Sequence, residues 1–376
     1  MPINTFFLRV AARCNLNCDY CYVFKHRDRS WEKMPAAISD NVINKFAQRI
    51  YEYIYEKKLK QINVIFHGGE PLFIGKKRLI EIVDKIRDVC KNEASISFSL
   101  QTNGTLLDEK FLDDCANRGI GISLSVDGPE KVHNSHRKYR SGLGSFQDVS
   151  NAIDLLKKYP MIFEGVIGVI NPNFTPEEVL SFYDNKDLTN MDLLLPDSTY
   201  VEPPVGREND YFMYSNWLIN AFDSWFTKHQ RLHYRTFEHI LQGLLGNKLT
   251  LDTFGLGKLD YITVETDGSY HTSDIMKVAY ENASATGLTL FDASISEAIS
   301  SEKILEYNKL LSWDNLPSEC KNCEFGGICG GGCLPHRFSN KNGFNNPSIY
   351  CREIKALFIH ARNKLFDEIE KETIRS

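Results

Sequence analysis

Short apolar runs with the composition of strands alternate with longer segments of helical periodicity from residue 6 to residue 229. The first pair is FFLRVA (6–11) followed by DNVINKFAQRIYEYIYEK (40–57). This alternation predicts a parallel sheet covered by helices, either doubly wound or curved into a partial barrel. Five further strand–helix pairs follow: 62–67 with 76–90, 96–101 with 109–118, 121–126 with 145–159, 163–170 with 175–185, and 191–196 with 211–229.

The segments that follow the predicted strands are polar or rich in glycine. A run of three cysteines follows the first strand, and the next five strands are followed by FHGGEP, QTNGT, SVDGP, INPN and PDSTY. The carboxyl ends of parallel strands meet at one edge of the sheet, where ligands bind in such architectures. Asn-Gly and Asp-Gly are also common turn dipeptides, so each segment alone is equally consistent with an ordinary turn. Six of them on one edge predict a site.

Composition excludes several classes of function. The 376 residues carry 42% hydrophobic and 25% charged residues, as in an ordinary globular protein. No run approaches the roughly 20 apolar residues that span a bilayer, and no signal-peptide pattern opens the chain. The net charge of −5 is dispersed and gives no electrostatic case for nucleic acid. We therefore predict a cytoplasmic protein without nucleic-acid or membrane partners.

The ten cysteines are unevenly placed, and in a chain without an export signal they do not suggest a disulfide framework. Cys90 and Cys115 are isolated in helical patterns, which is typical of small buried apolar residues. The other eight form two groups: Cys14, Cys18 and Cys21 near the start, and Cys320, Cys323, Cys329, Cys333 and Cys351 near the end.

The first group, CNLNCDYC, has three thiols with gaps of three and two residues. A structural zinc site usually takes four protein ligands, and His26 is the nearest further candidate. Three thiolates that hold a [4Fe–4S] cube leave one iron open to a non-protein ligand. The spacing, with GGEP after the second strand, resembles the signature of the radical S-adenosylmethionine (SAM) superfamily. That resemblance implies a partial (β/α)6 barrel, with Cys14, Cys18 and Cys21 as ligands of the SAM-binding cluster.

The same resemblance implies a set of SAM contacts. Tyr20 and Val169 would lie near the adenine, and the GGE segment would receive the SAM ammonium. Asn103 and Ser125 match positions that contact the ribose, although turn capping also explains them. Arg137 matches an arginine that pairs with the SAM carboxylate, with Arg140 as a rival. The implied contacts are Tyr20, Gly68, Gly69, Glu70, Asn103, Ser125, Arg137 and Val169.

The second group has the spacing C-x2-C-x5-C-x3-C followed by a distant cysteine, and alone it would favour zinc. Beside a radical SAM core it resembles the SPASM extension, which holds auxiliary [4Fe–4S] clusters. A complete SPASM domain has two more cysteines upstream, but here Ser273 stands where one is expected. One complete auxiliary cluster is therefore implied, with Cys333 left as a spare thiol and two clusters in total. Its ligands would be Cys320, Cys323, Cys329 and Cys351.

Longer stretches of the chain, such as VETDGSYHTSDIMK and CGGGCLPHRF, resemble the cyclophane-forming maturases of ribosomally made peptides. That resemblance implies a precursor peptide as substrate and an electron donor such as flavodoxin or ferredoxin. It also implies a radical SAM core over 1–235 and a bridging and SPASM-like domain over 236–376. An anaerobic sulfatase maturase is the alternative enzyme, and a non-catalytic iron–sulfur or zinc scaffold is the third hypothesis.

The implied reaction removes a β-hydrogen from the peptide, joins the carbon radical to an aromatic ring and needs a base. Asp197 follows the sixth predicted strand, and Asp274 follows Ser273. A carboxylate suits this role if burial raises its pKa towards neutrality. The alternatives are that Asp197 begins a turn and that Asp274 is an ordinary ion-pair partner.

Overall fold

The computed structural model describes residues 2–91, 93–247, 249 and 253–375. The chain forms two compact units. The first unit comprises residues 1–126, 133–165 and 259–308, and the second comprises 127–132, 166–258 and 309–376.

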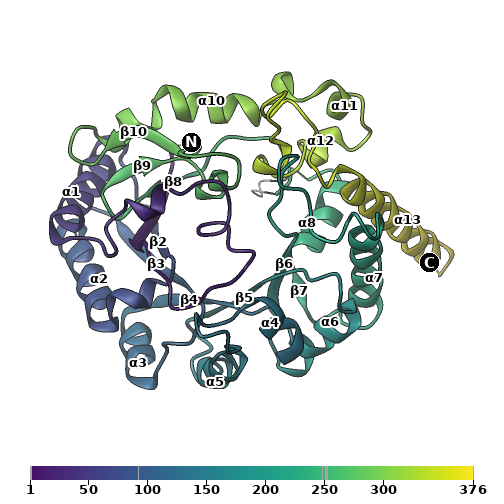
Figure 1. Cartoon of the computed structure of the whole chain (residues 1–376), viewed down its shortest axis with the longest axis horizontal. Coiled ribbons are helices and arrows are strands. Elements are labelled where there is room, and N and C mark those ends of the chain that lie inside the picture. Colours follow the sequence, from purple (N-terminus) through teal and green to yellow (C-terminus); the bar gives the residue numbers. More distant parts are fainter. Residues whose placement is uncertain (1, 92, 248, 250–252, 376) are drawn as a thin grey trace. The chain divides into compact units, whose positions relative to one another are not determined.

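The sheet of the first unit has its strands in the order β10-β9-β8-β1-β2-β3-β4 (Figure 1). Neighbours from β8 through β1 to β4 are parallel, whereas β9 pairs antiparallel with both β8 and β10. The bounds are β1 Thr5–Ala11, β2 Gln61–Gly68, β3 Ser95–Thr102, β4 Ile120–Ser125, β8 Tyr261–Val264, β9 Ser269–His271 and β10 Ala285–Thr289.

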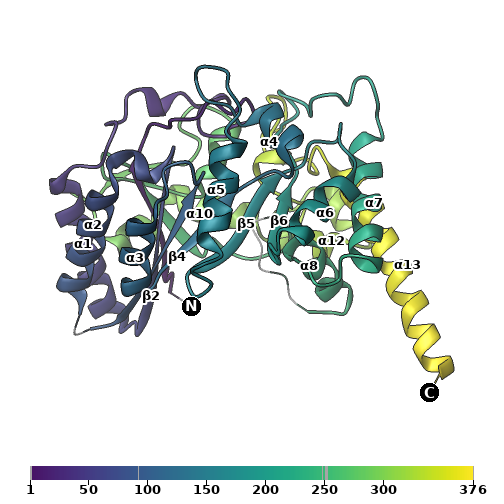
Figure 2. The same cartoon turned by 90° about the horizontal axis from the view of Figure 1, so that it is seen from below.

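Helices cover this sheet on one side. Figure 2 shows the first three helices side by side, and Figure 1 shows the loop after β1 on the side of the strands away from them. The bounds are α1 Asp40–Lys57, α2 Lys76–Cys90, α3 Glu109–Arg118, α5 Phe146–Leu156 and α9 Ile295–Ile299. Two further helices, α4 Glu130–His136 and α10 Glu302–Leu310, have residues in both units.

Local sequence explains where these helices begin and end. The Ser39 hydroxyl accepts a hydrogen bond from the Val42 backbone N–H at the start of α1, and Asp108 caps α3 through the Phe111 N–H. Gly119 ends α3 at a φ of 59°, a conformation that glycine adopts without a steric penalty. The apolar face of α1 packs on β1, where the ring of Phe6 meets that of Phe46 edge to face.

The second unit holds parallel strands β5, β6 and β7 with helices packed against them. Figure 1 shows α13 beside α7, and the rings of Phe222, Trp225 and Phe237 pack together in its core. The bounds are β5 Phe163–Val169, β6 Asn190–Leu194, β7 His233–Tyr234, α6 Pro176–Asn185, α7 Met213–Thr227, α8 Arg235–Leu244, α11 Ser318–Lys321, α12 Gly326–Cys329 and α13 Cys351–Arg375. β5 begins at residue 163, in the first unit.

The predicted α/β class is confirmed, because all six predicted strands and the six helices paired with them are present as β1–β6 and α1, α2, α3, α5, α6 and α7. The pattern did not reveal β8, which extends the sheet by pairing with β1. The domain boundary at residue 235 stays a prediction. Within the described residues, every helix is too short or too polar to cross a membrane.

Candidate active site

The three N-terminal cysteines lie in the loop between β1 and α1, and all are half-buried. The backbone N–H of Leu16 points at the Cys14 sulfur at 3.4 Å. The carbonyl of Cys21 accepts hydrogen bonds from the N–H groups of Phe24 and Lys25. Backbone groups of the loop itself therefore fix two of the three cysteines.

The GGE segment at the end of β2 holds this loop by close backbone contact. The N–H of Gly69 donates to the Ala11 carbonyl at 2.8 Å, and the N–H of Glu70 donates to the Arg13 carbonyl at 3.1 Å. A Cβ at Gly68 would lie 2.3 Å from the Ala11 oxygen, and one at Gly69 would lie 2.3 Å from the Arg13 oxygen. Both positions therefore require glycine, since a side chain would push away the backbone that leads into Cys14.

Glu70 and Asn103 connect the ends of β2 and β3. The buried Glu70 carboxylate accepts hydrogen bonds from the Thr102 hydroxyl at 2.7 Å and the Asn103 N–H at 2.8 Å. The Asn103 amide donates to the Asn15 side chain at 2.9 Å, and its oxygen accepts from the Thr105 N–H. Asn103 thus caps the turn after β3, which is one of the two roles predicted for it. It also contacts Asn15, the residue that follows Cys14.

Tyr20 and Arg137 are brought together near the cysteine loop. The Arg137 guanidinium lies 5.6 Å from the Tyr20 ring centroid. Burial raises the pKa of Cys21 and of Glu70, and the charge of Arg137 opposes part of that rise. Arg140, its rival, is exposed.

The Ser125 hydroxyl, at the end of β4, accepts a hydrogen bond from Gln101. Val169 lies in the second unit, where its N–H donates to Asp127.

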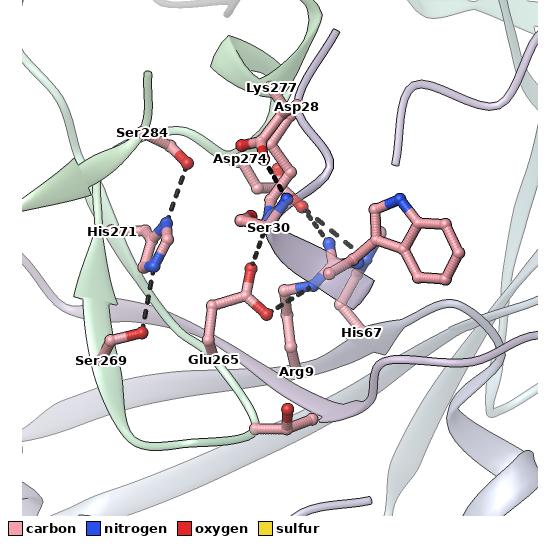
Figure 3. A network of polar contacts seen from close by, with 12 residues as sticks. Arg9, Asp28, Ser30, His67, Glu265, Ser269, His271, Asp274, Lys277 and Ser284 are labelled. Atoms are coloured by element: carbon pink, nitrogen blue, oxygen red, sulfur yellow. Dashed lines mark hydrogen bonds and ion pairs between the residues drawn. The ribbon is translucent and has the colours of Figure 1, made fainter. Parts of the chain in front are cut away.

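A buried group of four charges lies between β1 and the segment that follows β8 (Figure 3). The Arg9 guanidinium forms an ion pair of 2.6 Å with Asp274 and one of 3.3 Å with Glu265. Glu265 also pairs with Lys277 at 2.9 Å. Two cations thus compensate two anions, which is the arrangement that makes buried charge tolerable.

Asp274 has further polar neighbours. The Tyr22 hydroxyl donates to it at 2.8 Å, and the His67 Nδ1 lies 3.9 Å from the same carboxylate oxygen. Burial works to raise the pKa of Asp274, but Arg9, His67 and Tyr22 together bring that pKa below its ordinary value. The condition that burial raises its pKa towards neutrality is therefore not met. Burial lowers the pKa of His67 to about 4, so this imidazole is neutral at pH 7.

Sequence reasoning did not find Arg9, Tyr22, His67, Glu265 or Lys277. Arg9 lies within an apolar strand, where a single charged residue in the sequence signals a buried partner. No spacing rule identifies that partner, because Glu265 and Asp274 are more than 250 residues away along the chain.

Replacing Arg9 with Met should lower the free energy of unfolding by about 3–5 kcal/mol, because it leaves an uncompensated buried carboxylate. Urea denaturation of the two proteins measures the difference. The double variant Arg9→Met/Asp274→Asn removes one charge of each sign and should recover part of the loss. A double variant no more stable than Arg9→Met would argue against charge compensation as the cause.

Four of the five C-terminal cysteines meet at a small cavity in the second unit, which has about 50 Å³ of space for the centres of water-sized molecules and is partly open to solvent. Its other walls are mainly apolar, with Phe325, Ile354 and Phe358 among them. A Cβ at Gly326 would lie 2.1 Å from the Cys320 carbonyl, so this tight turn requires glycine. The four sulfur-bearing residues that line the cavity are Cys320, Cys323, Cys329 and Cys351.

Both cysteine groups have the thiol ligands that suit a cluster of positively charged metal ions. Burial raises the pKa of Cys14 to about 12, and Glu70, Cys18 and Cys21 add to the shift against the Leu16 N–H. Burial, followed by Cys351 and Cys320, raises the pKa of Cys329 to about 12. Thiols that oppose one another's ionisation become thiolates together only beside positive charge, which metal ions supply. Among the described residues, no group of three or more Cys, His, Asp or Glu side chains is placed to hold a single metal ion.

The remaining candidates are separate from these groups. Cys333 is buried and is not among the residues that line the cavity. Ser273, at the position where SPASM domains have a cysteine, is buried and hydrogen-bonded to the Tyr261 hydroxyl. Asp197 lies after β6 in the second unit, where His336 Nε2 is 3.1 Å from its carboxylate.

Comparison with known proteins shows the class of enzyme. Residues 8–184 match the model of the radical SAM superfamily. The chain contains a radical SAM domain and is a radical SAM enzyme. This finding confirms the predicted cofactor class, SAM with iron–sulfur clusters. The assignment of particular residues to these cofactors stays a prediction.

Two relatives and one solved structure are similar to this radical SAM enzyme over most of its length. It is 27% identical to a cysteine-type anaerobic sulfatase-maturating enzyme of Clostridium perfringens, over 97% of this chain and 98% of the relative. It is 23% identical to the radical SAM cyclopropyl synthase TigE of Paramaledivibacter caminithermalis, over 87% of this chain and 67% of the relative. The structure of native anSMEcpe with bound AdoMet and Cp18Cys peptide matches with a TM-score of 0.82 and 26% identity, over 98% of this chain and 99% of that one.

Proposed function

We propose that this radical SAM enzyme oxidises a residue of a peptide or protein at its β-carbon, in the manner of an anaerobic sulfatase maturase. The observation that carries the proposal is the match to a sulfatase-maturating enzyme along 97% of the chain. Sulfatase maturation is the alternative to cyclophane formation named in the sequence analysis, and the comparisons support it better than the cross-linking of an aromatic ring.

Three regions of the chain carry the proposed chemistry. Cys14, Cys18 and Cys21 hold the cluster that binds SAM, and the four cysteines of the C-terminal cavity hold one auxiliary cluster. When bound, SAM and its cluster supply a 5′-deoxyadenosyl radical that removes a hydrogen atom from the substrate. The SAM contacts are those named from the sequence, and an electron donor such as flavodoxin or ferredoxin is the proposed redox partner.

Asp274 is the proposed base that takes the proton released as the substrate is oxidised. Arg9 and Tyr22 hold its carboxylate in one orientation and keep it ionised. A pKa below the ordinary value makes it a weak base. The one electron that the substrate radical loses would be accepted by the auxiliary cluster. A weak base is sufficient here, since loss of that electron makes the remaining proton of the substrate strongly acidic. Asp197 is the second candidate, with His336 as its neighbour.

Cyclophane formation is the second candidate reaction, and one observation favours it. No cysteine occurs between Cys115 and Cys320, and Ser273 occupies the expected ligand position. The sulfatase maturases are expected to keep the two upstream SPASM cysteines. An enzyme with a single auxiliary cluster therefore departs from that group at the ligands of the inner cluster.

Product analysis distinguishes the two reactions. The reconstituted enzyme is incubated with SAM, dithionite and two peptides, one carrying a sulfatase-type Cys or Ser and one carrying aromatic-x-x motifs. The maturase reaction would convert the Cys or Ser to formylglycine, an aldehyde that reacts with a hydrazide probe. Cyclophane formation removes two hydrogens without making a carbonyl, so its product does not react with the probe. We expect a hydrazide-reactive product from the first peptide. A product only from the second peptide, with no carbonyl, would replace the maturase assignment with cross-linking.

A further inference from the structure

Arg337 is a fully buried cation beside the C-terminal cavity. It follows the last cysteine of the compact run and lies in a short 3₁₀ helix, Pro335–Arg337. An ideal Cβ at Gly331, which lines the cavity, would be 3.5 Å from the Arg337 Nη1. The guanidinium is therefore at the wall formed by this glycine.

The hydrogen bonds of Arg337 leave its charge uncompensated. Its Nε donates to the carbonyl oxygens of Phe344 and Asn346, at 3.0 and 3.2 Å, and its Nη1 donates to the Leu310 carbonyl at 3.0 Å. All three acceptors are neutral. The Nη2 is buried and has no hydrogen-bond partner among the described residues.

A buried cation without an anion is unfavourable, so a negative group is expected nearby. The cavity is lined by four cysteines and by Glu319, whose side chain is exposed and solvated. The cysteines are therefore the less solvated groups from which the negative charge is expected. Burial lowers the pKa of Arg337, and attraction to Cys320 and Cys329 opposes that change. Lys355 also lines the cavity, but this second cation is exposed and solvated.

We propose that Arg337 is a positioning residue whose buried charge compensates the thiolate-bound auxiliary cluster and raises its reduction potential. This inference rests on the cluster assignment in the proposed function. A cube held by four thiolates is an anion, and reduction adds one further negative charge. A fixed neighbouring cation stabilises the reduced form more than the oxidised form. Solvent does not weaken this effect, since the guanidinium is buried.

The potential of the auxiliary cluster tests the proposal without substrate or SAM. The background is the full chain with Cys14→Ala/Cys18→Ala/Cys21→Ala, so that any remaining cluster is the auxiliary one. Dithionite titration monitored by electron paramagnetic resonance gives the midpoint. Arg337→Gln should lower the equilibrium constant for reduction about tenfold, which is about 59 mV for a one-electron couple.

Two controls separate buried charge from other causes. Arg337→Lys keeps the charge and should keep the potential, whereas Lys355→Gln removes an exposed charge and should shift it much less than Arg337→Gln. Unchanged potential in Arg337→Gln with about four irons would overturn the proposal. A Lys variant that loses the cluster or shifts as far as Gln would also overturn it, since guanidinium geometry would then be the requirement. Absence of iron from the variant that lacks Cys14, Cys18 and Cys21 would instead refute the auxiliary cluster of the proposed function. That outcome differs from a cluster whose potential does not depend on Arg337.

Discussion

Replacing Cys14, Cys18 and Cys21 with alanine should abolish SAM cleavage and halve the bound iron. The intact chain should reconstitute with about eight irons and eight acid-labile sulfides, and the triple variant with about four, because each [4Fe–4S] site holds four. The remaining iron is expected at the C-terminal cavity lined by the other four predicted ligands. Iron and sulfide analysis after anaerobic reconstitution, with chromatographic detection of 5′-deoxyadenosine, measures both effects.

The double variant Cys90→Ala/Cys115→Ala is the matched control. Both cysteines are buried in helices α2 and α3, away from the two cysteine groups in the sequence. This variant should keep about eight irons and cleave SAM. About twelve irons in the intact chain would reveal an inner auxiliary site with unrecognised ligands. Complete loss of iron in the triple variant would leave the C-terminal cysteines to zinc.

The regular part of the fold was predictable because each element carries its own local pattern. The sequence SISFSLQT needs no distant partner to be recognised as a strand, and Ser39 and Asp108 mark helix starts through their caps. The cysteine groups could also be recognised from the sequence, because their spacings are short-range patterns typical of metal-cluster ligands. Their four C-terminal members do line one cavity, with Cys333 not among the lining residues.

The surroundings of Asp274 were not predictable, because they depend on contacts between distant segments. β8 pairs in parallel with β1, and this pairing brings the Glu265 segment to Arg9. Burial of a lone carboxylate would raise its pKa, which is what the sequence led us to consider. The structure adds a cation 2.6 Å from Asp274, and the sign of the shift is reversed.

The glycines of the GGE segment show how one residue can satisfy two requirements. The family resemblance implied that this segment receives the SAM ammonium. The structure supplies an independent reason, because the backbone of residues 11–13 occupies the space where a Cβ would lie. The need for glycine at these positions therefore has a physical cause that the motif alone did not indicate, and their contact with SAM stays a prediction.

Replacing Asp274 with Asn should lower the rate of peptide modification by about 100-fold or more, within the range for loss of an acid–base group. Asn nearly preserves the shape of the side chain but accepts no proton at neutral pH. Iron content should stay unchanged, since Asp274 is not a predicted ligand. The informative quantity is the ratio of modified peptide to 5′-deoxyadenosine, which should fall if hydrogen abstraction continues and the later proton transfer does not.

Glu265→Gln is the control for Asp274→Asn, because it removes the other anion that contacts Arg9. Both variants disturb the same buried charges, so both should lose stability in urea denaturation. Only Asp274→Asn should change the ratio of product to 5′-deoxyadenosine. An equal fall in both variants would make Asp274 a structural partner of Arg9. Unimpaired modification by Asp274→Asn would transfer the role of base to Asp197, whose own Asn variant would then be the one to lose product.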